Sequence, residues 1–252
     1  MASEFNPQFQ SKKRRTSPWF LPLMVMLILG IVIIIVSLFY RVRDIQVVNG
    51  TDYADGQIVE ASGIELGANL FFINRFQAAS MIFSSLPYVE AVTIEQEAPS
   101  TIILHVQGST AVGYVELDEE LWLIDRKGKI LEKISLETAE DFVHIRGITP
   151  IAPVPGELLV SDEEGIARIG YALSILDSLM AENLLAKVAW IDLEDVADPV
   201  MLYDNRFTVN LGPNEEVPYK FALFADVTQR LSTGDRGTLR YTGGTSWTFS
   251  PD

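Results

Sequence analysis

Residues 86–106, LPYVEAVTIEQEAPSTIILHV, carry the pattern that decides the fold of this chain. Two β-strands are predicted, over residues 89–95 and 101–107. In the second strand, apolar side chains recur at alternate positions, with only Ile103 out of pattern. The Pro-Ser pair at positions 99 and 100 favours a turn between the strands. The segment therefore predicts two strands joined by a short connection.

Upstream of these strands, the pattern changes to that of helices. A helix is predicted over residues 75–86, where Asn74 can cap its start and Pro87 stops it. A shorter helix is predicted over residues 55–62, and a strand over residues 43–48. On the longer helix, one face is expected to be apolar and to carry Phe76, Ala79, Ile82, Phe83 and Leu86. The predicted order over residues 43–107 is thus strand, helix, helix, strand, strand.

Residues 19–40, WFLPLMVMLILGIVIIIVSLFY, contain no charged side chain. As a helix they would extend about 33 Å at about 1.5 Å per residue, which is enough to cross a hydrocarbon core of about 30 Å. We therefore predict a transmembrane helix. A cleaved signal peptide is disfavoured, because no small-residue cleavage site follows.

Basic residues are more numerous before this helix than after it. Lys12, Lys13, Arg14 and Arg15 precede it, and only Arg41 and Arg43 follow closely. The positive-inside rule then predicts that residues 1–18 form a cytoplasmic tail and that residues 41–252 lie outside the cytoplasm.

A second region begins near residue 111 and mixes short strands with two helices. One helix starts near Ser161, and the other opens at Pro218. The expected inward side chains are Ile166, Ile169, Leu173, Leu176 and Met180 on the first, and Phe221, Phe224, Val227 and Leu231 on the second. Strands are predicted at residues 121–124, 129–134, 142–145, 188–193, 200–203, 207–211 and 237–242. The fold class is α+β, with a sheet rich in antiparallel strands.

Composition excludes several kinds of function. The chain has 252 residues, of which 48% are hydrophobic, with 34 acidic and 19 basic residues and a net charge of −15. This acidity argues against nucleic acid as a partner, because phosphate binding needs clustered Lys and Arg. There is no cysteine, and the two histidines lack the local spacing of a zinc site. We find no catalytic motif and expect no enzymatic activity, cofactor, metal site or small-molecule substrate.

The order and spacing of several segments resemble those of the FtsQ/DivIB family of bacterial cell-division proteins. Three segments resemble the POTRA module of that family, and three resemble its β domain. After the third POTRA strand the family often has Glu-Arg-x-Pro, whereas this chain has Gln107-Gly108-Ser109-Thr110. The POTRA-like segments are RVRDIQVVNG (41–50), GIELGANLFFIN (63–74) and residues 86–106; the others are LWLIDRKGKIL (121–131), FTVNLGPNEEVPYKFALFADV (207–227) and TLRYTGGTSW (238–247).

This resemblance implies a POTRA domain (βααββ) over residues 41–110 and a β domain over residues 111–252. It also implies a single-pass, non-enzymatic protein of the bacterial cell membrane. Such a protein would lie at the division septum and bind small single-pass division proteins of the FtsB/DivIC and FtsL type. The POTRA domain would be the binding site for other division proteins.

The resemblance places the partner-binding residues on and beyond the strand at residues 237–242. They are Leu239, Arg240, Tyr241 and Trp247. We take this strand as the last of the sheet and expect one of its sides to lack a partner strand, so that it can accept a strand from another protein.

The sequence leaves two other functions open. One is a POTRA-containing component of a secretion or outer-membrane assembly system. The other is a membrane-anchored enzyme acting on cell-wall polymer. The first would need repeated POTRA units or a barrel, and the second a catalytic signature.

Overall fold

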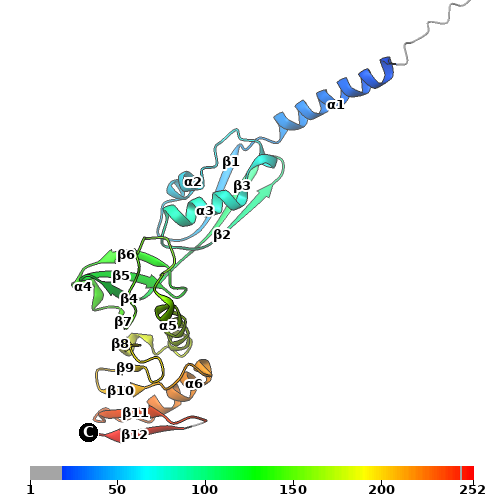
Figure 1. Ribbon diagram of the computed structural model, residues 1–252. Helices are drawn as coiled ribbons and strands as arrows, with labels where there is room; N and C mark the ends of the chain where they lie inside the picture. Colours follow the sequence, from blue (N-terminus) through cyan, green and yellow to red (C-terminus); the bar gives the residue numbers. More distant parts are fainter. Residues whose placement is uncertain (1–18, 245) are drawn as a thin grey trace, which may run out of the picture.

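The computed structural model describes residues 19–244 and 246–252. The molecule is elongated, with helix α1 at one end, a small sheet next to it and a large sheet beyond (Figure 1). The predicted cytoplasmic tail and its basic cluster, residues 1–18, lie outside the described residues. The fold class agrees with the α+β prediction.

Helix α1 (Phe20–Phe39) contains 20 residues, none of them charged. Its large hydrophobic side chains are exposed, as expected of a helix that has no protein around it. By length and composition α1 can cross a membrane, which agrees with the predicted span of residues 19–40.

The small sheet has the predicted order of strands and helices. Its strands lie in the order β1-β3-β2, with β3 antiparallel to β2 and parallel to β1. The helices pack together and cover one face of the sheet (Figure 1). The elements are β1 (Asp44–Gly50), α2 (Asp55–Ser62), the short 3₁₀ helix η1 (Leu70–Phe72), α3 (Arg75–Ser85), β2 (Val89–Glu97) and β3 (Thr101–Gly108).

One side chain of α3 departs from the prediction. Ile82 is fully buried in the core of this module, and Ala78 is also buried. Phe76, which the pattern places on the apolar face, is 86% exposed. The prediction for Phe76 is wrong because the buried face of α3 is centred on Ala78 and Ile82, and at about 100° per residue Phe76 lies about 120° from Ile82 around the helix.

The large sheet contains nine strands in the order β12-β11-β10-β9-β8-β7-β4-β5-β6. Two strands in it, β4 and β12, are absent from the sequence predictions. The strands are β4 (Ala111–Leu117), β5 (Glu120–Asp125), β6 (Ile130–Ile134), β7 (Val143–Arg146), β8 (Val188–Asp192), β9 (Val200–Tyr203), β10 (Phe207–Asn210), β11 (Gly237–Tyr241) and β12 (Trp247–Pro251); the helices are α4 (Leu136–Ala139), α5 (Glu163–Ala181), η2 (Leu185–Lys187) and α6 (Val217–Thr228).

Helices α5 and α6 pack against each other and against this sheet (Figure 1). The inward face of α6 is as predicted, because Phe221 and Phe224 are fully buried. The inward face of α5 is rotated relative to the prediction: Ile166 is 61% exposed, whereas Tyr171 and Ile175 are fully buried.

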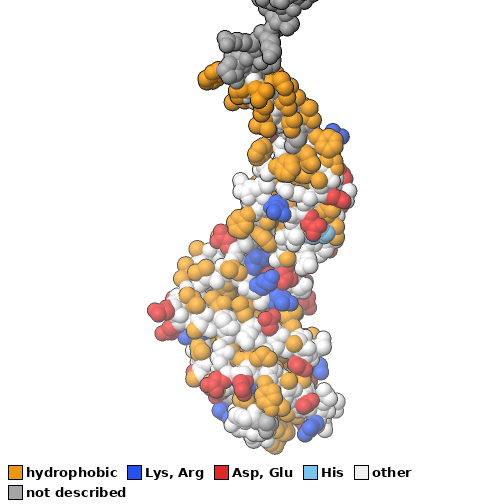
Figure 2. Space-filling model, turned by 90° about the vertical axis from the view of Figure 1, so that its right-hand side faces the viewer, with side chains coloured by type: hydrophobic (Ala, Val, Ile, Leu, Met, Phe, Trp, Pro, Cys, Tyr) orange, Lys and Arg blue, Asp and Glu red, His pale blue; other side chains and the backbone are white. Residues whose placement is uncertain are grey.

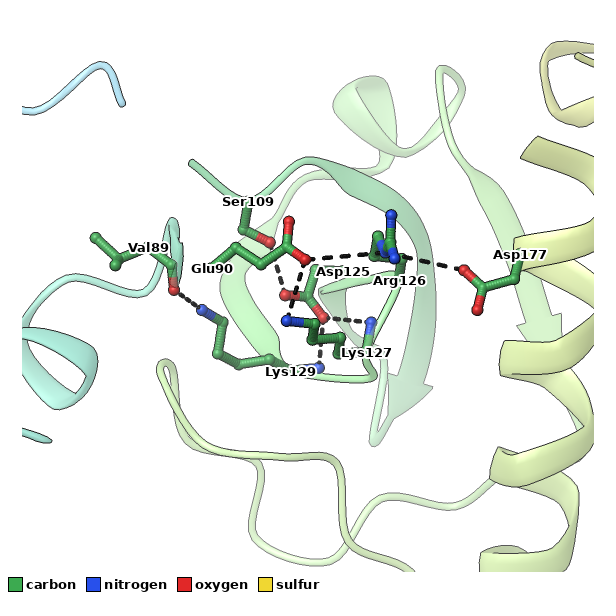
Figure 3. A network of polar contacts seen from close by, with 8 residues as sticks. All are labelled: Val89, Glu90, Ser109, Asp125, Arg126, Lys127, Lys129 and Asp177. Carbon is green, nitrogen blue, oxygen red and sulfur yellow. Dashed lines mark hydrogen bonds and ion pairs between the residues drawn. The ribbon is translucent and has the colours of Figure 1, made fainter. Parts of the chain in front are cut away.

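A network of polar contacts joins the two modules (Figure 3). At its centre, the carboxylate of Asp125 is fully buried at the end of β5. It accepts a hydrogen bond from Ser109 Oγ at 2.6 Å, and from the backbone N–H groups of Lys127 and Lys129 at 2.8 and 2.9 Å. The short linker between β3 and β4 is thereby bonded to the β5–β6 turn.

Charged side chains extend this network across the junction. Glu90 of β2 lies 3.1 Å from Lys127 Nζ and 3.9 Å from Arg126 Nε. Arg126 Nε also lies 3.9 Å from a carboxylate oxygen of Asp177 on α5. The β5–β6 turn therefore contacts both modules.

Two further contacts cross the same junction. The buried Lys129 donates a hydrogen bond to the backbone carbonyl of Val89. Tyr88 donates its hydroxyl proton to Glu132 at 2.6 Å. Burial lowers the pKa of Lys129, and burial together with the Glu132 contact raises the pKa of Tyr88.

Candidate partner-binding edge of the large sheet

The strand expected to form an open edge is an inner strand of the sheet. β11 pairs with β10 on one side and with β12 on the other, so the prediction that one of its sides lacks a partner is wrong. β12 is one of the two edge strands, with β6 at the other end of the sheet, and in the described part of the chain no strand pairs with the outer side of β12. β12 lies at the end of the molecule farthest from α1 (Figure 1).

The four residues assigned to partner binding occupy β11 and β12 but differ in exposure. Leu239 is fully buried and belongs to the core. Arg240 is exposed, with Nη1 3.0 Å from a carboxylate oxygen of Asp198. Tyr241 and Trp247 are opposite each other in the β11–β12 pair, with ring centroids 5.4 Å apart. The structure thus brings the two aromatic residues together and places Leu239 elsewhere.

Lys220 of α6 lies against this aromatic pair. Its Nζ lies 4.9 Å from the centroid of the Tyr241 ring, a distance at which a cation is attracted to the ring face. The same Nζ donates to the carbonyl of Pro213 at 2.7 Å, and the Trp247 indole N–H donates to the carbonyl of Lys220 at 3.3 Å. The side chain is fully buried, and this burial lowers the pKa of Lys220.

The backbone of β12 presents unpaired groups on its outer side. Backbone groups alternate between the two sides of an antiparallel strand. Thr248 and Ser250 therefore face β11, while the N–H and C=O groups of Trp247 and Phe249 face outward. Pro251 also faces outward but has no N–H. The hydrogen bonds at the two ends of the β11–β12 pair show which residues of β12 face β11. The N–H of Thr242 donates to the carbonyl of Ser246, and the N–H of Asp252 donates to the carbonyl of Arg236.

Gly237 allows β12 to lie close to β11, and Phe249 of β12 remains partly exposed to solvent. Gly237 has φ +146°, and a Cβ atom there would lie 2.2 Å from the carbonyl oxygen of Ser250, so only glycine allows this approach. Phe249 is 36% exposed, and its ring centroid lies 6.1 Å from that of Phe207.

A groove of about 480 Å³ opens beside Tyr241, where the loop before α6 meets the β11–β12 turn. Its lining includes Glu215, Glu216, Arg240 and Tyr241. The outer side of β12 suits an extended chain that pairs through its backbone. Within residues 19–244 and 246–252, no cluster of three or more His, Asp and Glu side chains could hold a metal ion.

Sequence reasoning missed two residues of this edge, Phe249 and the buried Lys220. For Phe249 a signal was present, because Trp247, Thr248 and Phe249 alternate aromatic and polar side chains as a strand does. For Lys220 the signal was its position as the lysine within a largely apolar predicted helix.

Comparison with known proteins supports the module built on the small sheet. Residues 40–107 match the family model described as "POTRA domain, FtsQ-type". These residues include the whole small sheet apart from Gly108.

Similarity to individual proteins extends over most of the chain. The chain is 23% identical over 182 residues to "Cell division protein DivIB" of Clostridium tetani, covering 72% of this chain and 67% of that protein. It is 22% identical over 221 residues to the protein of the same name from Clostridium botulinum strain Loch Maree, covering 87% and 84%. It is 21% identical over 217 residues to "Cell division protein FtsQ" of Corynebacterium glutamicum, covering 82% and 90%.

Proposed function

Because the chain belongs to the FtsQ/DivIB family of bacterial cell-division proteins, we propose that it is a non-enzymatic scaffold of the division apparatus. A role in cell division follows from the relatives. In our proposal, α1 anchors the protein in the cell membrane at the septum, the POTRA domain spans residues 41–110 and the β domain residues 111–252. The outer part binds small single-pass proteins of the FtsB/DivIC and FtsL type and so helps to assemble or regulate septal peptidoglycan synthesis.

The observation that carries the proposal is the open outer side of β12. The outward N–H and C=O groups of Trp247 and Phe249 can pair with an added strand. Aromatic residues and arginine often contribute most to binding energy at interfaces, and Tyr241, Trp247 and Arg240 lie at this edge. We therefore propose strand addition to β12, with Leu239 supporting the edge from the core.

One pair of variants at a single position tests strand addition. Phe249→Pro removes an outward N–H, while the hydrogen bonds between β12 and β11 come from other residues. Phe249→Ala removes the same ring and keeps the N–H. The affinity of the full chain in lipid nanodiscs for the extracytoplasmic part of its FtsB/DivIC-type protein is measured by calorimetry.

We expect Phe249→Pro to bind about tenfold more weakly than Phe249→Ala, equivalent to about 1.4 kcal/mol, because a donor is lost and the proline ring obstructs pairing. Both variants should melt at similar temperatures. Equal affinities would place the partner elsewhere. Depletion of the protein should give filamentous cells; secretion defects at normal cell length would instead contradict the division role.

A further inference from the structure

Four large apolar side chains are exposed at the end of the POTRA domain next to α1. They form what we call the proximal patch: Leu66, Phe71, Phe72 and Phe76, with 68%, 63%, 85% and 86% of each residue exposed. Exposed apolar residues concentrated in one place commonly mark a contact surface. In Figure 2, hydrophobic side chains continue from α1 onto the adjoining end of the next module, and mixed charges begin farther away.

Hydrogen bonds attach the loop of this patch to the residues that follow α1. Three backbone bonds of 2.8 to 2.9 Å connect the two segments, and the ring centroids of Tyr40 and Phe71 are 4.8 Å apart. The patch therefore stays next to the helix end. The bonds run from Leu70 N to Tyr40 O, from Val42 N to Ala68 O and from Gly67 N to Val42 O.

One contact fixes the position of the loop around residues 69–72 along the axis of α1. Asn69 Nδ2 lies 3.3 Å from the carbonyl oxygen of Ser37, which is in the last turn of α1. A helix of 20 residues is about 30 Å long and matches the thickness of the hydrocarbon core, so its last turn lies near the boundary with the headgroups. Residues 69–72 then lie at the same level.

The charges around the patch suit a lipid surface. Arg41, Arg43 and Arg75 are exposed, and none of them forms an ion pair with another described residue. Glu65 is the only acidic residue in the segment 63–74, and the exposed acidic residues next to it are Asp44 at the start of β1 and Glu97 at the end of β2. Arginine side chains next to apolar ones are typical of surfaces that contact anionic headgroups while apolar groups enter the interface.

We propose that the proximal patch inserts into the outer interface of the membrane that α1 crosses, so that the POTRA domain is docked on the lipid surface. This inference rests on the proposed role of α1 as a membrane anchor. Insertion would limit the tilt of the POTRA domain and, through the junction around Asp125, direct β12 away from the membrane.

Site-directed spin labelling of the full chain in vesicles of phosphatidylcholine and phosphatidylglycerol tests the proposal. The chain has no cysteine, so single labels can be placed without other changes. Phe72→Cys reports on the patch, and Leu136→Cys, at a residue 79% exposed in the β domain, is the aqueous control. Gly30→Cys, where a Cβ has open space, is the reference inside the membrane.

We expect labels at positions 72 and 30 to collide more often with oxygen than with a water-soluble nickel chelate, and the label at position 136 to show the reverse. If position 30 is protected and position 72 is as accessible to nickel as position 136, docking is overturned and the anchor stands. If position 30 is also accessible, the proposed anchor itself fails. Protection of position 72 only when a division protein is added would make the patch a protein-binding surface and overturn lipid docking.

As a further control, Leu66→Cys can carry the label in a Phe72→Ser/Phe76→Ser background. The label at position 66 should then shift toward the aqueous pattern. An unchanged depth would show that the two phenylalanines do not hold the loop in the interface.

Discussion

The ammonium group of Lys220 lies 4.9 Å from the centroid of the Tyr241 ring. One face of this ring therefore covers a buried charge, while the residue is still partly exposed at the proposed partner-binding edge. Because Tyr241 serves both contacts, its replacement should affect folding as well as binding.

Tyr241→Ala should weaken partner binding by about 2 kcal/mol or more if the ring is a hot spot. It should also lower the free energy of unfolding by about 1 kcal/mol, because the ring contacts with Lys220 and Trp247 are lost. Tyr241→Phe is the matched control, since it removes only the hydroxyl that donates to Gly244. Calorimetry and thermal melting measure the two effects. Unchanged affinity for Tyr241→Ala would exclude this residue from the interface.

Asp125→Ala should lower the free energy of unfolding by about 3 kcal/mol, because three donors lose their acceptor in a buried site. Ser109→Ala removes only one of these hydrogen bonds and should cost about 1 kcal/mol. Denaturant unfolding of both variants gives the comparison. Equal effects would mean that Asp125 acts only through the Ser109 contact.

Residues 41–110 alone should fold, because they contain a separate core of twelve buried side chains. Their stability should be small, since about 70 residues bury a limited apolar surface and the contacts from Tyr88, Val89 and Glu90 to the β domain are lost. A dispersed NMR spectrum would support the boundary. A random-coil spectrum, while the full chain remains folded, would show that the two modules form one cooperative unit.

Acidification should destabilise the protein through His144. Its ring stacks on Tyr114 with centroids 4.5 Å apart, and Arg146 Nε donates to its Nδ1 at 3.3 Å. Burial and the Arg146 charge lower the pKa of His144 below its ordinary value of 6.5, although the carboxylates of Glu116 and Asp192 oppose this shift. The unfolded chain therefore binds more protons, and stability falls as the pH decreases through 6.5 toward the lowered pKa.

The measurement is the melting temperature over a pH series, with His144→Gln for comparison. The variant should show a weaker dependence in this window, since glutamine does not titrate. An identical pH dependence in the two proteins would assign it to other groups.

The topology is testable with single cysteines. A membrane-impermeant thiol reagent added to intact cells should label Ser250→Cys, which is exposed on β12, and should spare Ser11→Cys in the basic tail. The charge asymmetry around residues 19–40 is the physical reason. Labelling of the tail position alone would reverse the proposed orientation.

Local patterns in the sequence were sufficient for the apolar helix and for the order of elements in the POTRA domain. Span length and side-chain periodicity are properties of neighbouring residues, so they need no knowledge of distant contacts. They could not place Phe76, because the face of α3 that is buried depends on how the helix packs in the core of this module.

The tertiary structure decided which strand forms the open edge and what lies behind it. β12 became an edge strand because β11, its hairpin partner, pairs on its other side with β10; this parallel pairing crosses over α6 and is a long-range contact. Lys220 became buried because the loop before α6 and the end of β11 close around it. The junction likewise depends on the folded chain. Only there does Ser109 of the linker lie within hydrogen-bonding distance of Asp125, and Glu90 of β2 within ion-pairing distance of Lys127 and Arg126.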